Sequence, residues 1–123
     1  MERRIDVSNL DLDRAASIIA ARRSGWYAVG LTADMLTWMD NDAEWPAPLL
    51  TDRSQIQRPM SLGLRISGDA GEAEFVLYAG GWADTGYAPP GSDELTSEYF
   101  ELDNAEEFGA VLDRVIGCLT GTQ

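Results

Sequence analysis

The residues with the clearest chemical role are acids and aromatics in the second half of the sequence. Two large aromatic side chains and an aspartate share a stretch rich in glycine and proline, residues 80–91, and several glutamates follow it. Aromatic side chains anchor protein interfaces because they bury a large area while losing little rotamer freedom. Carboxylates beside them can pair with the cations of a partner. We therefore predict a partner-binding site made of Trp82, Asp84, Tyr87, Glu98, Glu101 and Glu106.

The composition excludes most catalytic chemistry. The 123 residues include no histidine, and all nine cationic side chains are arginines. Histidine bases, histidine metal sites, lysine Schiff bases and the lysine of phosphate-binding loops are therefore impossible. The motifs G-x-G-x-x-G and G-x-S-x-G are absent as well. We predict a protein that is not an enzyme, with no catalytic residue and no cofactor.

One acidic stretch resembles the start of a calcium-binding loop. Residues 40–44 place oxygen-bearing side chains at alternate positions, as an EF-hand loop does. The match then fails, because the sixth position is Trp45 instead of glycine and the twelfth is Thr51 instead of glutamate. We predict no metal site. Trp38 and Trp45, which flank the stretch, are a second candidate pair of interface anchors.

Charge is distributed unevenly along the chain. Residues 1–66 hold nine acids and eight arginines, whereas residues 67–123 hold twelve acids and Arg114 alone, and the net charge is −12. Nucleic acid would repel so acidic a chain, so we predict no direct binding of DNA or RNA. The acidic excess has two interpretations. It keeps molecules dispersed in solution, or it docks on a basic protein partner, whose association it would accelerate.

The first half of the chain gives a helix and less regular structure. Apolar residues at helical spacing predict a helix over 9–24, ended by Gly25. Alternating side chains predict a strand over 26–31, and residues 35–39 fit either its hairpin partner or a short helix. Prolines interrupt every pattern in 40–59, which we interpret as a long surface loop.

The clearest local pattern is a β-hairpin. Residues 60–66 and 73–79 alternate apolar and polar side chains on either side of a glycine-rich turn, 68–71. Residues 80–92 are then expected to form a glycine-rich loop. Its two large aromatics are either exposed anchors or a lid that folds back over the sheet edge.

A strand and a helix complete the chain. The strand is predicted over 96–102 and the helix over 103–119. Asp103 and Glu106 have the spacing of a capping box, in which the first accepts from free amides and the second reaches back. Cys118 lies on the apolar stripe of this helix and is most simply a small buried hydrophobe.

The order of helix, strand pair, hairpin, strand and helix predicts an α+β fold. Strands that follow one another through turns form antiparallel sheets, and the helices then cover one face. We expect one domain over 1–123, with an antiparallel sheet of about four to five strands and an N-terminal and a C-terminal helix packed on one face. A doubly wound parallel sheet would need more helices between its strands.

The sequence also predicts a compartment. No apolar run of signal-peptide length follows the first residues, and the longest apolar cluster, 15–21, is far too short to cross a membrane. We expect a cytoplasmic protein that contacts no membrane and exists as a monomer or a homodimer.

Half of the chain resembles a known group of proteins. The hairpin residues 61–71 and 72–78, with the strand 98–102 that runs into the helix 103–119, are similar to the carboxyl half of small acidic immunity proteins from actinobacterial polymorphic-toxin loci. The resemblance implies a sheet with a terminal helix that neutralises a cognate toxin, often a nuclease or deaminase, by covering its active site. Its implied partner is a basic toxin domain.

Residues and resemblance together predict a non-catalytic inhibitor that binds another protein. In this hypothesis Asp84, Glu98, Glu101 and Glu106 supply the charge, while Trp82 and Tyr87 are the apolar anchors. Two alternatives remain open. The protein could be a small acidic secretion chaperone that binds an effector segment, or a phage-type inhibitor that imitates nucleic acid with its carboxylates.

Overall fold

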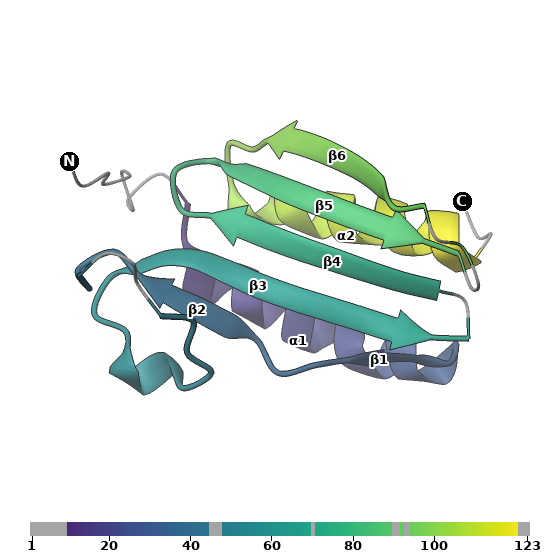
Figure 1. Ribbon diagram of the computed structural model, residues 1–123, viewed down its shortest axis with the longest axis horizontal. Coiled ribbons are helices and arrows are strands. Elements are labelled where there is room, and N and C mark those ends of the chain that lie inside the picture. Colours follow the sequence, from purple (N-terminus) through teal and green to yellow (C-terminus); the bar gives the residue numbers. More distant parts are fainter. Residues whose placement is uncertain (1–9, 45–47, 70, 90–91, 93, 121–123) are drawn as a thin grey trace.

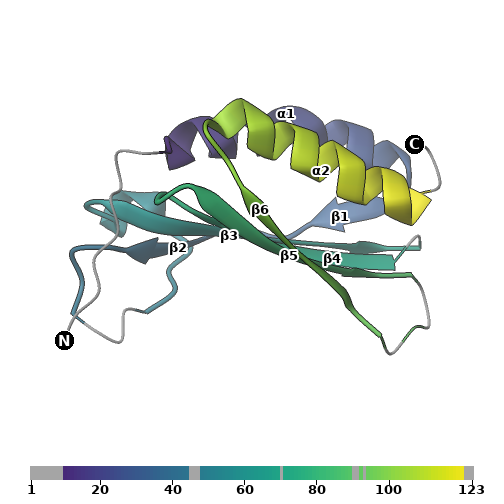
Figure 2. The ribbon, with the colours of Figure 1, turned by 90° about the horizontal axis from the view of Figure 1, so that it is seen from above.

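The sheet and its helices form two layers. The computed structural model describes residues 10–44, 48–69, 71–89, 92 and 94–120. In that part of the chain six antiparallel strands form one sheet, and two helices lie against one of its faces (Figures 1 and 2). This confirms the predicted α+β class, with six strands where four to five were expected. We call the face without a helix the open face.

The strand order defines the two edges of the sheet. The elements are α1 (Leu12–Ala28), β1 (Leu31–Ala33), β2 (Thr37–Asp40), a 3₁₀ turn (Arg53–Gln55), β3 (Pro59–Gly68), β4 (Gly71–Tyr78), β5 (Trp82–Ala88), β6 (Thr96–Glu101) and α2 (Ala105–Thr120). Across the sheet the order is β1-β3-β4-β5-β6, and β2 also pairs with β3. β6 is therefore one edge, and β1 and β2 share the other (Figure 1).

The predicted hairpin is confirmed as β3 and β4. Leu64 pairs with Phe75 and Arg65 pairs with Glu74, so one face of the hairpin is apolar and the other is polar. The apolar face meets the helices, where Phe75 and Phe108 of α2 pack edge to face with ring centroids 6.2 Å apart. This contact fixes the helix layer against the centre of the sheet.

α1 extends into the region predicted as a strand, so the expected strand over 26–31 is wrong. Gly25 lies inside the helix, and Trp26, which is buried, continues the apolar stripe that includes Ile19. Burial of the indole outweighs the modest cost of a glycine in a helix. The glycine that ends the helix is Gly30, with φ of 84°, a conformation that glycine adopts without strain.

The segment that follows α1 is also arranged differently. The expected hairpin partner at 35–39 becomes β2, which pairs with β3 instead of with the strand before it. Most of the described residues in 40–59, which exclude 45–47, are irregular, as predicted, apart from the 3₁₀ turn and the isolated bridge of Leu50 with Trp38. Asp40 and Asn41 are nevertheless buried, so the loop is anchored at its start.

The glycine-rich segment predicted as a loop over 80–92 is mainly strand β5. Gly81, with φ of 115°, makes the tight return from β4. Gly86 lies within the strand, and the side chain of Leu95 packs over it. A Cβ at position 86 would be 2.8 Å from Leu95 Cδ2, so a larger residue would displace Leu95. These glycines therefore serve close packing in a sheet, which the sequence pattern alone does not distinguish from a loop.

The predicted helix at the end of the chain is confirmed, but its cap lies one residue later. The Glu107 N–H donates to Asn104 Oδ1 at 2.9 Å, and Glu107 Oε1 accepts from the Asp103 N–H at 2.7 Å. Asn104 is thus the cap in place of Asp103, and Glu107 reaches back in place of Glu106. Cys118 is only partly buried on this helix.

Candidate functional site

β5 carries both predicted aromatic anchors, but on opposite faces of the sheet. Strand alternation turns Trp82 toward the open face and Tyr87 toward the helices. Tyr87 packs against the core, where burial, followed by the charges of Glu98 and Cys118, raises the pKa of its hydroxyl. The two side chains cannot contact one surface of a partner together, because the segment between them is a strand.

Two of the predicted acids form ion pairs within the molecule. Glu98 lies on the helix side of β6, and its two carboxylate oxygens accept from the Arg114 guanidinium at 3.0 and 2.9 Å. Glu106 on α2 accepts from the Arg14 guanidinium of α1 at 3.4 Å. These pairs join β6 to α2 and α2 to α1. Neither acid lies on the open face.

The structure brings the other three predicted residues together. Trp82 pairs with Glu101 across β5 and β6, and Asp84 lies on the same face, one step along β5. Each row continues onto β4, because Trp82 also pairs with Tyr78 and Asp84 with Val76. We define the open-face patch by two adjacent rows, namely Tyr78, Trp82 and Glu101, and then Val76, Asp84 and Tyr99.

The aromatic side chains of the open-face patch are held in place. The rings of Tyr78 and Trp82 stack with centroids 5.0 Å apart and an angle of 18° between their planes. The indole also lies over Gly80, where an added Cβ would clash with Trp82 Cζ3. Tyr99 is 58% exposed, and its hydroxyl donates to Glu101 Oε2 at 3.4 Å. The rings are therefore ordered before any partner binds, which reduces the entropy cost of binding.

The charges in the open-face patch are negative, and no ion pair within the described residues neutralises them. In the part of the chain that the structure describes, no arginine forms an ion pair with Asp84 or Glu101. Burial, and then the charge of Asp84, raises the pKa of Tyr78. Burial, followed by the charge of Glu101 and the hydrogen bond to it, raises the pKa of Tyr99. The two carboxylates thus give the aromatic surface a negative potential.

Sequence reasoning missed Tyr78 and Tyr99 as members of the site. Tyr78 lies on the polar face of the hairpin, and Tyr99 lies on the same side of β6 as Glu101, opposite to Phe100, as strand alternation requires. The missing information was that β5 is a strand, because only β5 joins the two tyrosines into one surface.

The open face continues as an apolar hollow beside β2. Its volume is about 290 Å³, and Gly63 and Val76 are among its lining residues. Met35 and Leu49 also line it and are 70% and 63% exposed. Arg65 and Glu74, which form an ion pair, line the hollow as well, and Val76 belongs both to the hollow and to the open-face patch. The hollow and the open-face patch are therefore contiguous on the face that the helices leave uncovered.

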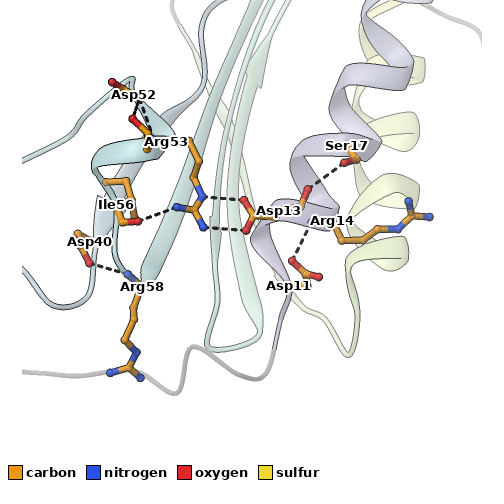
Figure 3. Close-up of polar contacts among 10 residues, drawn as sticks. Asp11, Asp13, Arg14, Ser17, Asp40, Asp52, Arg53, Ile56 and Arg58 are labelled. Carbon is orange, nitrogen blue, oxygen red and sulfur yellow. Dashed lines mark hydrogen bonds and ion pairs between the residues drawn. The ribbon is translucent and has the colours of Figure 1, made fainter.

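The second predicted pair of aromatic anchors is not an exposed surface. Trp38 is only 4% exposed, and the Arg53 guanidinium lies over its ring at 5.3 Å. Arg53 also donates to both carboxylate oxygens of Asp13 at 2.8 and 2.9 Å and to the Ile56 carbonyl, which ties the 3₁₀ turn to α1 (Figure 3). Trp45 lies outside the described residues. Trp38 is therefore part of the core.

Asp40 anchors the loop that precedes β3. Its carboxylate accepts from the backbone N–H groups of Gln57 at 2.9 Å, Asp42 at 3.0 Å and Arg58 at 3.1 Å. Burial by itself would raise the pKa of Asp40, but the three hydrogen bonds and the charge of Arg53 together hold it below its ordinary value. The carboxylate is therefore a structural group.

Comparisons with known proteins do not identify the role of the open-face patch. No family model, no curated protein and no solved structure matches the chain. Among the described residues, no three or more Asp, Glu or Cys side chains lie close enough together to hold a metal ion. No helix in the same residues is long and apolar enough to cross a membrane. The interpretation of the open-face patch therefore depends on its own chemistry.

Proposed function

We propose that the protein is a non-catalytic inhibitor of the immunity type, which binds a basic protein partner in the cytoplasm through the open-face patch. The observation that carries this proposal is the stacked pair of Tyr78 and Trp82 beside two carboxylates that form no ion pair with any described arginine, on the face that neither helix covers. The partner would be a toxin domain of the nuclease or deaminase type, and inhibition would consist of covering its active site.

The physical argument concerns the cost of covering the two carboxylates. A buried carboxylate without a partner is strongly destabilising, so Asp84 and Glu101 select a partner that supplies arginine or lysine. The ordered rings of Tyr78 and Trp82 add apolar area at little entropy cost. A protein that binds nucleic acid or an anionic nucleotide has such a cationic surface at its active site, and the net charge of −12 accelerates its approach.

The patch supports an inhibitor better than it supports either alternative. Imitation of nucleic acid requires a row of carboxylates, whereas each row of the patch holds one acid among apolar and aromatic neighbours. A secretion chaperone requires a long apolar groove, whereas the hollow beside Met35 and Leu49 has a volume of only about 290 Å³ and is lined in part by Asp34, Arg65 and Glu74. The combination of ordered rings and unpaired acids is typical of an interface with a folded basic protein.

The test uses the product of the neighbouring gene and, in parallel, proteins captured from a lysate of the source organism. We expect the wild-type chain to form a stoichiometric complex and to suppress the partner's activity. Trp82→Ala should weaken the complex by about 2 kcal/mol, or roughly 30-fold, because a central tryptophan is lost. Isothermal titration calorimetry measures the affinity, and thermal unfolding verifies that the variant folds.

Tyr87→Phe is the matched control for the Trp82 variant. It changes an aromatic residue of the same strand on the helix side while keeping the ring in the core, so affinity should stay the same. Equal affinity of Trp82→Ala and wild type, or full activity of a saturated partner, would show that the proposed function is wrong.

A further inference from the structure

β6 presents an unpaired backbone edge next to the open-face patch. It is the last strand in the sheet order, and its six residues pair with β5 on one side only. Among the described residues, no backbone hydrogen bond reaches the outer side of this strand. A strand edge of this kind is a template for pairing with another chain.

The pairing register identifies which backbone groups point outward. The Leu102 N–H donates to the Gly81 carbonyl, so Leu102 belongs to a hydrogen-bonded pair with β5. In an antiparallel ladder such pairs alternate, which directs Glu98 and Phe100 toward β5 as well. The N–H and C=O groups of Ser97, Tyr99 and Glu101 therefore point away from the sheet.

The opposite edge of the sheet is closed by the chain itself. Trp38 in β2 exchanges two backbone hydrogen bonds with Leu50, at 2.7 and 2.9 Å. Arg23 of α1 donates to the carbonyls of Ala33 and Asp34 beside β1, at 3.0 and 3.2 Å. Among the described residues, the chain thus covers the edge at β1 and β2 and leaves the outer side of β6 without a backbone partner.

The side chains of β6 specify what an added strand should carry. On the open face the outermost residues are Tyr99 and Glu101, and this acid has no arginine partner in the described chain. On the helix side Glu98 is neutralised by Arg114. On the open face an added strand would meet Glu101 and the exposed ring of Tyr99, whereas on the helix side Arg114 already pairs with Glu98 and lies over Phe100, so the strand gains from cations at every second residue.

We propose that β6 accepts an additional strand from the basic partner, an extended segment with arginine or lysine at alternate positions that face the open-face patch. This inference rests on the proposed function, because it names the part of the partner that binds. The new backbone hydrogen bonds supply affinity independent of side chains, and the alternate cations supply specificity. The partner's remaining surface then covers the patch.

A second copy of this chain fits the edge poorly. It would bring another molecule of net charge −12 against this one, and its own β6 offers acids where the edge needs cations. Electrostatic repulsion between like-charged edges opposes such pairing. Sedimentation of the free protein decides this point, because dimers that disappear in Ser97→Pro would identify a second copy as the occupant and overturn the proposal.

The test uses a ten-residue synthetic peptide of alternating arginine and valine. Its control has the same composition with all arginines in one half, so total charge is matched and only spacing differs. We expect saturable binding of the alternating peptide, with slowed hydrogen exchange at the amides of Ser97, Tyr99 and Glu101 measured by NMR. Equal binding of the control peptide, or protection confined to other amides, would overturn the proposal.

A backbone substitution separates pairing from charge. Ser97→Pro removes an outward N–H and no bond to β5, so the sheet should stay intact. Ser97→Ala keeps the N–H and reports the contribution of the side chain alone. We expect Ser97→Pro to bind the alternating peptide, and the captured partner, about tenfold more weakly than Ser97→Ala. Tyr99→Pro compared with Tyr99→Ala repeats the test if Ser97→Pro unfolds.

The two proposals fail in different ways. If Trp82→Ala weakens the partner complex while Ser97→Pro and Tyr99→Pro do not, the proposed function stands and strand addition is wrong. If the peptide protects β6 while Trp82→Ala leaves the partner complex unchanged, strand addition stands and the open-face patch is not the interface. If neither substitution affects the complex, both proposals are wrong.

Discussion

The two edges of the sheet contain similar residues that are used in opposite ways. At β2 an aromatic residue, Trp38, is buried beneath the guanidinium of Arg53, and the strand bonds to Leu50. At β6 an aromatic residue, Tyr99, is 58% exposed beside an acid that has no arginine partner in the described chain. The difference shows that aromatic and charged residues indicate a binding surface only where no other residue of the same chain covers the ring or pairs with the charge.

Ion pairs within the chain also decide which acids of residues 67–123 are available to a partner. Five arginines among the described residues of 10–66 pair with acids of both halves, and the ion pairs are Arg14–Glu106, Arg22–Asp113, Arg53–Asp13, Arg58–Asp42 and Arg65–Glu74. Part of the acidic excess in the second half is therefore neutralised within the fold. Net charge predicts that a basic partner is favoured, whereas the remaining acids decide where it binds.

The largest expected difference between the edges concerns stability. Trp38→Ala should lower the free energy of unfolding by about 4 kcal/mol, because it opens a cavity and removes the surface on which Arg53 lies. Tyr99→Ala should leave the free energy of unfolding unchanged. Urea denaturation followed by circular dichroism measures both. Similar destabilisation by the two variants would show that the edges do not differ as described.

A smaller effect tests the anchor of the closed edge. Asp40→Asn should cost about 2 kcal/mol at pH 7, because an amide cannot accept from all three backbone N–H groups that the carboxylate binds. Urea denaturation of both proteins gives the difference. Asp42→Asn is the control, since its exposed pair with Arg58 contributes little.

The pKa of Asp40 gives this prediction a pH dependence. Because the folded-state pKa lies below the ordinary value of 3.8, the carboxylate stabilises the fold above that value, and this contribution is lost as pH falls through the folded-state pKa. The difference between wild type and Asp40→Asn should therefore be constant from about pH 5 to pH 7 and shrink at lower pH. A constant difference down to pH 2 would contradict the role of the carboxylate.

Local patterns predicted the fold well where one signal was sufficient. The β3–β4 hairpin followed from strict alternation, and the final helix followed from its apolar stripe. Sequence reasoning failed where burial by distant residues decides the structure. Trp26 extends α1 because it is buried by the sheet, and Gly86 belongs to a strand because Leu95 occupies its empty side-chain position.

The candidate site was predicted only in part for the same reason. Trp82, Asp84 and Glu101 are adjacent because β5 and β6 pair in a register that no local pattern contains. Glu98 and Glu106 lie on the helix side of β6 and on α2 instead, where Arg114 and Arg14, which are distant in the sequence, are their partners. Residue type therefore predicted an aromatic and acidic site, while the sheet register decides which of these residues lie together in the open-face patch.

The acids of the open-face patch and the acids of the helices should differ in their effect on the rate of association with the partner. Asp84→Asn combined with Glu101→Gln should weaken partner binding about tenfold, mainly through slower association, and should reduce its dependence on salt. Glu106→Gln combined with Asp113→Asn makes the same change of charge on the helices, and its effect should be much smaller. Stopped-flow association at several salt concentrations measures both. Equal effects would mean that only total charge matters.

The smallest expected effect concerns Arg65, which lies on the open face between the two edges. It pairs with Glu74 at 2.6 Å, and the two side chains are 64% and 51% exposed, so the pair contributes less than about 0.5 kcal/mol to stability. Arg65→Gln removes a cation from the face that should meet a basic partner and leaves Glu74 free to pair with that partner. We expect association to become about twofold faster at low salt, with no difference at high salt. Arg58→Gln makes the same change of charge in the loop before β3, so an equal acceleration there would show that the open face has no special role.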